Sequence, residues 1–135
     1  MSEAMETSMH LKEELDIVRA RALAKMLAQE LGFGIVDQTR IATAISELAR
    51  NVIVHATEGD LEIRPASRED GGKGLEIIVS DSGPGIADIE KAMRGGYSTS
   101  GGLGAGLVGV KRLMSEFRIE SAAGQGTRVW VRKWL

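Results

Sequence analysis

Ser80-Asp81-Ser82-Gly83-Pro84-Gly85-Ile86 opens the stretch around which the chain is organised. The apolar run immediately before it, residues 75–79, has the length and β-branched content of a buried strand. A strand that ends on Asp81 and continues into two glycines around a proline lets the backbone pass close to a flat ligand, toward which the carboxylate points as an acceptor. The alternative is a turn in which Asp81 caps its own backbone.

A glycine cluster closes the same stretch and runs into a helical pattern: Gly101-Gly102-Leu103-Gly104-Ala105-Gly106-Leu107. Backbone N–H groups that are free at the start of a helix bind phosphate. Residues 104–109 also match the dinucleotide motif G-x-G-x-x-G, but a polar loop precedes them instead of a strand, and the chain contains no Walker motif. The structural alternative is a flexible loop with a close helix contact at Gly109.

Glu47 and Asn51 are separated by four residues, so a helix places them on the same face. Asn can coordinate a magnesium ion that bridges phosphates, and Glu can accept the proton of an attacking hydroxyl or water. Taken alone, the pair is better explained as two polar residues on a solvent face. Beside an acceptor for a base and a cradle for phosphates, it indicates a nucleotide site.

The composition indicates one globular domain. The chain has 135 residues, a formal net charge of −2 and no cysteine. We expect residues 1–7 to be flexible and residues 8–135 to form the domain. The net charge argues against a nucleic-acid partner, and the absence of cysteine excludes disulfides and thiolate metal sites. No apolar run reaches transmembrane length, which predicts a cytoplasmic protein without membrane contact.

Hydrophobic periodicity predicts helices followed by hairpins. A helix at 15–31 carries apolar residues at helical spacing: Leu15, Val18, Ala22, Met26 and Leu27. Asp37 is the expected N-cap of the next helix, which ends near His55. The other expected elements are an edge strand at 8–11, a hairpin of strands 61–64 and 74–80, short and long helices at 88–94 and 104–117, and strands at 118–121 and 127–134. This order favours an α+β fold, a two-layer sandwich with helices on one face of a mixed, mostly antiparallel sheet.

The last strand alternates basic and aromatic side chains on one face: Arg128, Trp130, Arg132 and Trp134. The alternation predicts either a contact surface for a partner or the ordinary decoration of an open sheet. His10 and His55 have no partners at metal-ligand spacing, and His55 is better explained as a favourable charge at a helix C-terminus.

These motifs, in this order, resemble those of the GHKL ATPase superfamily, which includes DNA gyrase and the sensor histidine kinases. Glu47-x-x-x-Asn51 is similar to the N-box of the superfamily. Asp81-x-Gly83-x-Gly85-Ile86 and Gly102-x-Gly104-x-Gly106-Leu107 are similar to its two glycine boxes, and Thr127 follows Gly-x-Gly as in its final hairpin. Within the superfamily, residues 16–135 most resemble the bacterial anti-sigma-factor serine kinases.

The resemblance implies the Bergerat ATP-binding fold, with ATP and Mg²⁺ as cofactors. Asp81 would receive the adenine amino group with help from Thr127 through water, and Gly83, Gly85 and Ile86 would shape the base pocket. Asn51 would hold magnesium, and residues 93–101 would close as a lid. The phosphates would meet the segment that comprises Gly102, Leu103, Gly104, Ala105, Gly106 and Leu107. Glu47 would be the catalytic base, because a serine hydroxyl is a poor nucleophile without one.

The implied function is a serine/threonine protein kinase of a bacterial partner-switching stress response, the stressosome pathway. Its substrate would be a STAS-domain scaffold or antagonist, and its second partner a downstream phosphatase-type regulator. Many such kinases carry an arginine where this chain has Ser100, which leaves the assisting cation open among Arg50, Lys111 and Arg112. The alternatives are a nucleotide-binding switch without catalysis and, less favoured at this length, an ATPase without a protein acceptor.

Overall fold

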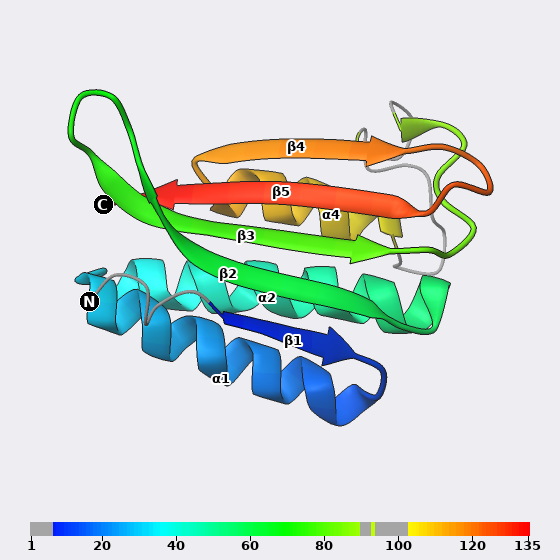
Figure 1. Ribbon diagram of the computed structural model, residues 1–135, viewed down its shortest axis with the longest axis horizontal. Helices are drawn as coiled ribbons and strands as arrows, with labels where there is room; N and C mark the ends of the chain where they lie inside the picture. Colours follow the sequence, from blue (N-terminus) through cyan, green and yellow to red (C-terminus); the bar gives the residue numbers. More distant parts are fainter. Residues whose placement is uncertain (1–6, 90–92, 94–102) are drawn as a thin grey trace.

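The computed structural model describes residues 7–89, 93 and 103–135. Figure 1 shows one layer of helices against one face of a sheet. The elements in chain order are β1 (Thr7–Leu11), α1 (Glu14–Leu31), α2 (Ile35–Ala56), β2 (Gly59–Ser67), β3 (Lys73–Asp81), α4 (Leu103–Leu113), β4 (Glu116–Ser121) and β5 (Thr127–Trp134). The strand order is β1-β2-β3-β5-β4, and all four pairs are antiparallel. The predicted α+β sandwich is confirmed, with antiparallel pairing throughout these strands.

β3 is the centre of the sheet and the main support of the core. Leu75, Ile77 and Val79 alternate toward the helices and are almost fully buried. They meet the apolar stripe of α2, whose members Ile41, Ile45 and Leu48 are at most 2% exposed. Because β3 pairs with β2 on one side and β5 on the other, its last residue, Asp81, is held from both sides.

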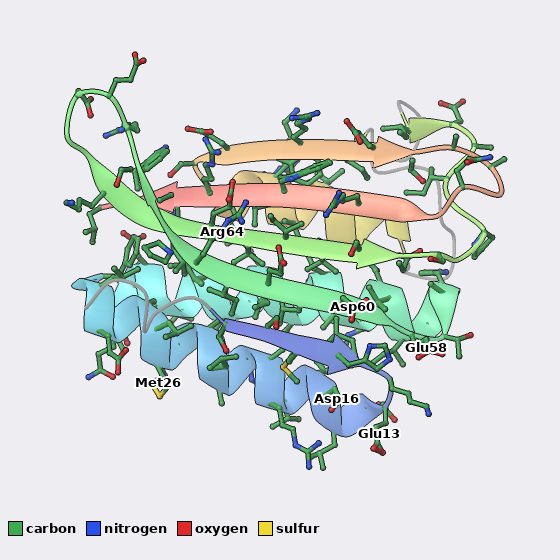
Figure 2. All side chains as sticks on the ribbon, viewed as in Figure 1. Glu13, Asp16, Met26, Glu58, Asp60 and Arg64 are labelled. Atoms are coloured by element: carbon green, nitrogen blue, oxygen red, sulfur yellow. The ribbon has the colours of Figure 1, made fainter. Side chains whose placement is uncertain are left out.

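α1 forms as predicted, but its apolar stripe faces the other way. Leu15, Val18 and Met26 are each about half exposed, and Met26 points away from the molecule (Figure 2). The buried face consists of Ile17, Ala20, Ala24, Leu27 and Ala28. The small alanine side chains let α1 pack closely on α2 and thereby determine which face of α1 is buried. A count of large apolar residues at helical spacing does not detect this face. Of the five expected stripe residues, only Leu27 is buried.

The helix boundaries differ from expectation at two places. α1 ends at Leu31 as expected, with Gly32 in the left-handed conformation at φ 103°. The N-cap of α2 is Gly34 and not Asp37. α4 ends at Leu113, and β4 begins at Glu116 instead of residue 118, so residues 116–117 belong to the sheet. Phe117 pairs with Val131, a long-range contact that a helical pattern in the sequence could not reveal. Of the short helix expected at 88–94, the described part contains helical residues 89 and 93.

The outer face of the sheet carries the basic and aromatic residues of β5. The Glu76 carboxylate of β3 accepts hydrogen bonds from Arg64 Nε at 2.7 Å and from Arg132 Nε at 2.8 Å. Burial raises the pKa of Glu76, but the two arginines together outweigh it and leave the pKa below its ordinary value. Trp130 stacks with two arginine side chains and Trp134 with one. This face is therefore ordered by its own ion pairs.

None of the helices in the described ranges combines the length and the apolar character that a membrane crossing requires.

Candidate functional site

Four residues lie in one row across the end of the sheet, on the face toward the helices. Gly59 of β2 pairs with Asp81 of β3, Asp81 pairs with Thr127 of β5, and Thr127 pairs with Ser121 of β4. Val79 and Val129, two residues from Asp81 and Thr127, are buried against the helices, which fixes the direction of the row. Residues from four strands thus meet at one edge of the core.

The carboxylate of Asp81 serves the local turn and also faces a cavity. Oδ1 accepts a hydrogen bond from the backbone N–H of Gly83 at 2.9 Å, as the turn alternative predicts. Within the described part of the chain, Oδ2 has no hydrogen-bond partner. The carboxylate lines the cavity. One oxygen therefore shapes the loop, and the other remains available as an acceptor.

The loop after Asp81 is held close to its neighbours. Gly83 lies so near to Ala56 of α2 that a Cβ on Gly83 would come within 2.5 Å of the alanine Cβ. Gly85 has φ 73°, a conformation that favours glycine, and a Cβ there would collide with the Ala122 carbonyl. Ile86 is 2% exposed and donates its backbone N–H to Ser121 Oγ. The glycines allow the loop to pass between α2 and the β4–β5 hairpin.

The cavity lies between α2, α4 and the end of β3 and β5, and has a volume of about 40 Å³. Its walls are mostly apolar, and the side chains of Asp81, Thr127, Asn51 and His55 add polar groups. The apolar lining comprises Leu48, Val52, Ala56, Val79, Pro84, Ile86, Leu107 and Val129. The lining, apolar with a few convergent polar groups, is of the kind found in small-ligand sites. A space of this volume holds about one water molecule, so a flat heteroaromatic ring would have to widen it.

Glu47 and Asn51 face α4 rather than bulk water. A Cβ on Gly106 would lie 3.1 Å from Glu47 Oε2 and 3.5 Å from Asn51 Nδ2. Asn51 Nδ2 is buried and, among the described residues, has no hydrogen-bond partner. A buried donor without a partner is rare in folded proteins and indicates a missing ligand or water. The alternative of a polar pair on a solvent face is therefore wrong for these two residues.

The second glycine box is described in part. Gly106 and Leu107 lie in the first two turns of α4, and Leu107 is 1% exposed and lines the cavity. Leu103, Gly104 and Ala105 begin the same helix, while Gly102 and most of the expected lid, except residue 93, lie outside the described ranges. A Cβ on Gly109 would meet nothing within 4 Å, so the close helix contact is at Gly106 and not at Gly109.

Three residues of the site were missed by sequence reasoning. His55 lines the cavity one turn after Asn51, and its spacing from Asn51 was a usable signal. Ser121 bonds to both Ile86 and Thr127, and Gly59 leaves room for Val52 beneath Asp81. Neither of these two has a motif of its own, because each role depends on strand pairing.

Charges around the site are sparse. The proposed assisting cations, Arg50, Lys111 and Arg112, are all exposed, and none of the three is among the residues that line the cavity. Within the described ranges, no group of three His, Asp or Glu side chains could hold a metal ion. A cation at this site would therefore need ligands from a bound molecule in addition to those of the protein.

Comparison with known proteins gives a consistent result. The sequence model of the histidine kinase-, DNA gyrase B- and HSP90-like ATPase family matches residues 36–135. The serine/threonine-protein kinase RsbT of Bacillus subtilis is 55% identical over 130 residues, which cover 96% of this chain and 97% of RsbT. The anti-sigma F factor of a Thermoanaerobacter species is 34% identical over 119 residues, which cover 86% and 83% of the two chains. The crystal structure of full-length ShkA in complex with AMPPNP has the same fold, with a TM-score of 0.56 at 20% identity, over 94% of this chain and 31% of ShkA.

Proposed function

The chain belongs to the histidine kinase-, DNA gyrase B- and HSP90-like ATPase family, and from that membership we propose that it is an ATP-dependent serine/threonine protein kinase. The observation that carries the proposal is the position of Glu47 and Asn51 on α2, directly opposite Gly106 of α4. A carboxylate and an amide stand there beside the start of a helix, where backbone N–H groups attract phosphate.

The adenine ring enters the cavity between α2 and the sheet, which widens to accept it. Asp81 Oδ2 accepts a hydrogen bond from the 6-amino group, and Thr127 takes part through a water molecule. The adjacent cross-strand positions of these two residues and the apolar walls of the cavity support this placement. Gly83, Gly85 and Ile86 shape the side of the pocket that the loop provides.

The phosphates meet the segment from Gly102 to Leu107. A magnesium ion fits the donor set, because an amide oxygen of Asn51 and the oxygens of phosphates are the hard ligands that Mg²⁺ prefers. The buried Nδ2 donor of Asn51, which has no partner among the described residues, and the absence of a side chain at Gly106 beside it support a phosphate oxygen as an acceptor at this point. The ion would supply positive charge that offsets the charge of the transferred phosphoryl group.

Glu47 acts as the general base. It lies one turn before Asn51 and is half-buried, with its Oε2 toward α4. A serine or threonine hydroxyl placed beside this carboxylate would give up its proton to it while the oxygen attacks the γ-phosphorus. The bond between the γ-phosphorus and the bridging oxygen of ADP breaks in the same step.

The protein substrate is a STAS-domain scaffold or antagonist of a stressosome pathway in the cytoplasm, and the second partner is a phosphatase-type regulator. The support is the 55% identity to a serine/threonine kinase together with the likeness to anti-sigma factors, whose name implies a regulatory partner. Phosphorylation of the scaffold would release the kinase to bind the regulator.

The test is transfer of label from γ-labelled ATP to a purified STAS-domain protein of the source organism. We expect label on serine or threonine of the acceptor, and mass spectrometry locates it. ATP binding without any transfer would instead favour the non-catalytic switch. Release of inorganic phosphate at the same rate with and without the acceptor would identify an ATPase.

A further inference from the structure

Ser121, the last residue of β4, connects three separate parts of the site. Its Oγ accepts the backbone N–H of Ile86 at 2.7 Å and donates to the carbonyl of Gly126 at 2.9 Å. The same Oγ lies 2.8 Å from Thr127 Oγ1. The loop after Asp81, the turn before β5 and the start of β5 thus share one hydroxyl group.

The direction of the third hydrogen bond follows from the other two. A serine hydroxyl has one proton and two lone pairs. The N–H of Ile86 can only donate, so it takes one lone pair of Ser121, and the carbonyl of Gly126 can only accept, so it takes the proton. The bond to Thr127 must therefore use the second lone pair, and Thr127 must be its donor.

This fixes what Thr127 can offer to a ligand. Its only hydroxyl proton is committed to Ser121, and only lone pairs remain toward the cavity that it lines. Its neighbour in the row, Asp81, also presents an acceptor, since an ionised carboxylate has no proton to give. This end of the cavity consequently accepts hydrogen bonds and donates none through these two side chains.

We propose that Ser121 is a positioning residue that makes the site select 6-aminopurine over 6-oxopurine nucleotides, because it holds the Thr127 hydroxyl as an acceptor. The inference rests on the proposed function, which places the base in this cavity. Adenine offers an amino group to Asp81, and a water between its N1 and Thr127 can donate to both. A 6-oxopurine presents a carbonyl and an N1–H at the same places, so its carbonyl faces acceptors.

The test compares ATP with inosine triphosphate, which differs from it only in the 6-oxo group and the N1–H. Affinities measured by calorimetry give an ATP-to-ITP ratio for the wild type and for Ser121→Ala. With Ser121 replaced, the Thr127 hydroxyl is free to donate, and we expect the ratio to fall about tenfold, the value of one redirected hydrogen bond. Ser121→Thr keeps the hydroxyl and should keep the ratio.

Ser115→Ala is the matched control. Ser115 Oγ also accepts a backbone N–H, that of Trp134 at 3.1 Å, but at the opposite end of β4. This variant should leave the ratio unchanged. If Ser121→Ala does not fold, Ser121→Cys replaces it, since a thiol keeps the volume but is a weak donor and acceptor.

A second comparison tests whether Ser121 acts through Thr127. In a Thr127→Val background we expect the ratio to be reduced already, and Ser121→Ala should reduce it no further. If Ser121→Ala lowers the affinities for ATP and ITP by the same factor, Ser121 is merely structural and the inference is wrong, while the kinase proposal stands. If the wild type binds neither nucleotide, the proposed function itself fails.

Discussion

Replacing Gly106 with alanine should separate the stability of this protein from its activity. The added methyl group would lie 3.1 Å from Glu47 Oε2 and 3.5–3.6 Å from the two polar atoms of the Asn51 amide. It would thus occupy the space between α4 and the two residues that we assign to phosphate transfer.

The expected stability change has two parts of opposite sign. Alanine in place of glycine within a helix stabilises by about 0.8–1.0 kcal/mol. The contact at 3.1 Å requires the end of Glu47 to move by a few tenths of an ångström, which a flexible, half-buried carboxylate can do at small cost. We therefore expect Gly106→Ala to change the free energy of unfolding by about 0 to +1 kcal/mol, and Tm by about 0 to +4 °C.

The expected loss of function is much larger. The added methyl group occupies the space that we assign to the reacting phosphate, and a phosphate pushed aside by about 1 Å can lose about 10²-fold in rate. The assay is phosphoryl transfer from labelled ATP to the STAS-domain acceptor, with Tm measured on the same samples. Gly109→Ala is the matched control, because a Cβ there meets nothing within 4 Å. Gly109→Ala should raise the free energy of unfolding by about 1 kcal/mol and leave the rate of phosphoryl transfer at the wild-type value.

Wild-type transfer by a folded Gly106→Ala variant would refute the assignment of this space to the reacting phosphate. A marked drop in Tm for Gly106→Ala, but not for Gly109→Ala, would show that the contact with Glu47 is rigid and that its cost was underestimated.

Three further predictions concern the site and the outer face of the sheet. Glu47→Ala should retain ATP binding by calorimetry while transfer of label falls about 10²–10⁴-fold, and unchanged transfer would remove Glu47 as the base. Asp81→Asn keeps an oxygen for the turn to Gly83 but replaces the free acceptor, so ATP affinity should fall about 10–100-fold; wild-type affinity would overturn the adenine assignment. Glu76→Gln should lower the free energy of unfolding at pH 7 by about 1–2 kcal/mol, because it weakens the bonds from Arg64 and Arg132. The folded-state pKa of Glu76 lies below its ordinary value of 4.5, so its contribution is present above that pH and is lost as the pH falls through the folded-state pKa. Urea unfolding between pH 7 and pH 3 should show the gap between wild type and variant closing below about pH 4.5, and a constant gap would contradict this role.

The outer sheet face illustrates what sequence reasoning could establish. Alternation along β5 placed Arg128, Trp130, Arg132 and Trp134 on one face, and the strand register confirms that face. Alternation could not show that Arg132 shares the carboxylate of Glu76, 56 residues away, because such a contact depends on which strands become neighbours. The partners of a surface residue are a property of the sheet order.

The sequence by itself determined the α+β class, the central strand that ends on Asp81, and the helix that carries Glu47 and Asn51, since each of these follows from local periodicity and short spacings. Only the tertiary structure decided that α1 buries its alanines, that Gly106 stands against Glu47, and that Ser121 directs the proton of Thr127. Each of these three features depends on which elements of the fold pack against each other: α1 against α2, α4 against α2, and β4 against β5. No periodicity within a single segment contains that information.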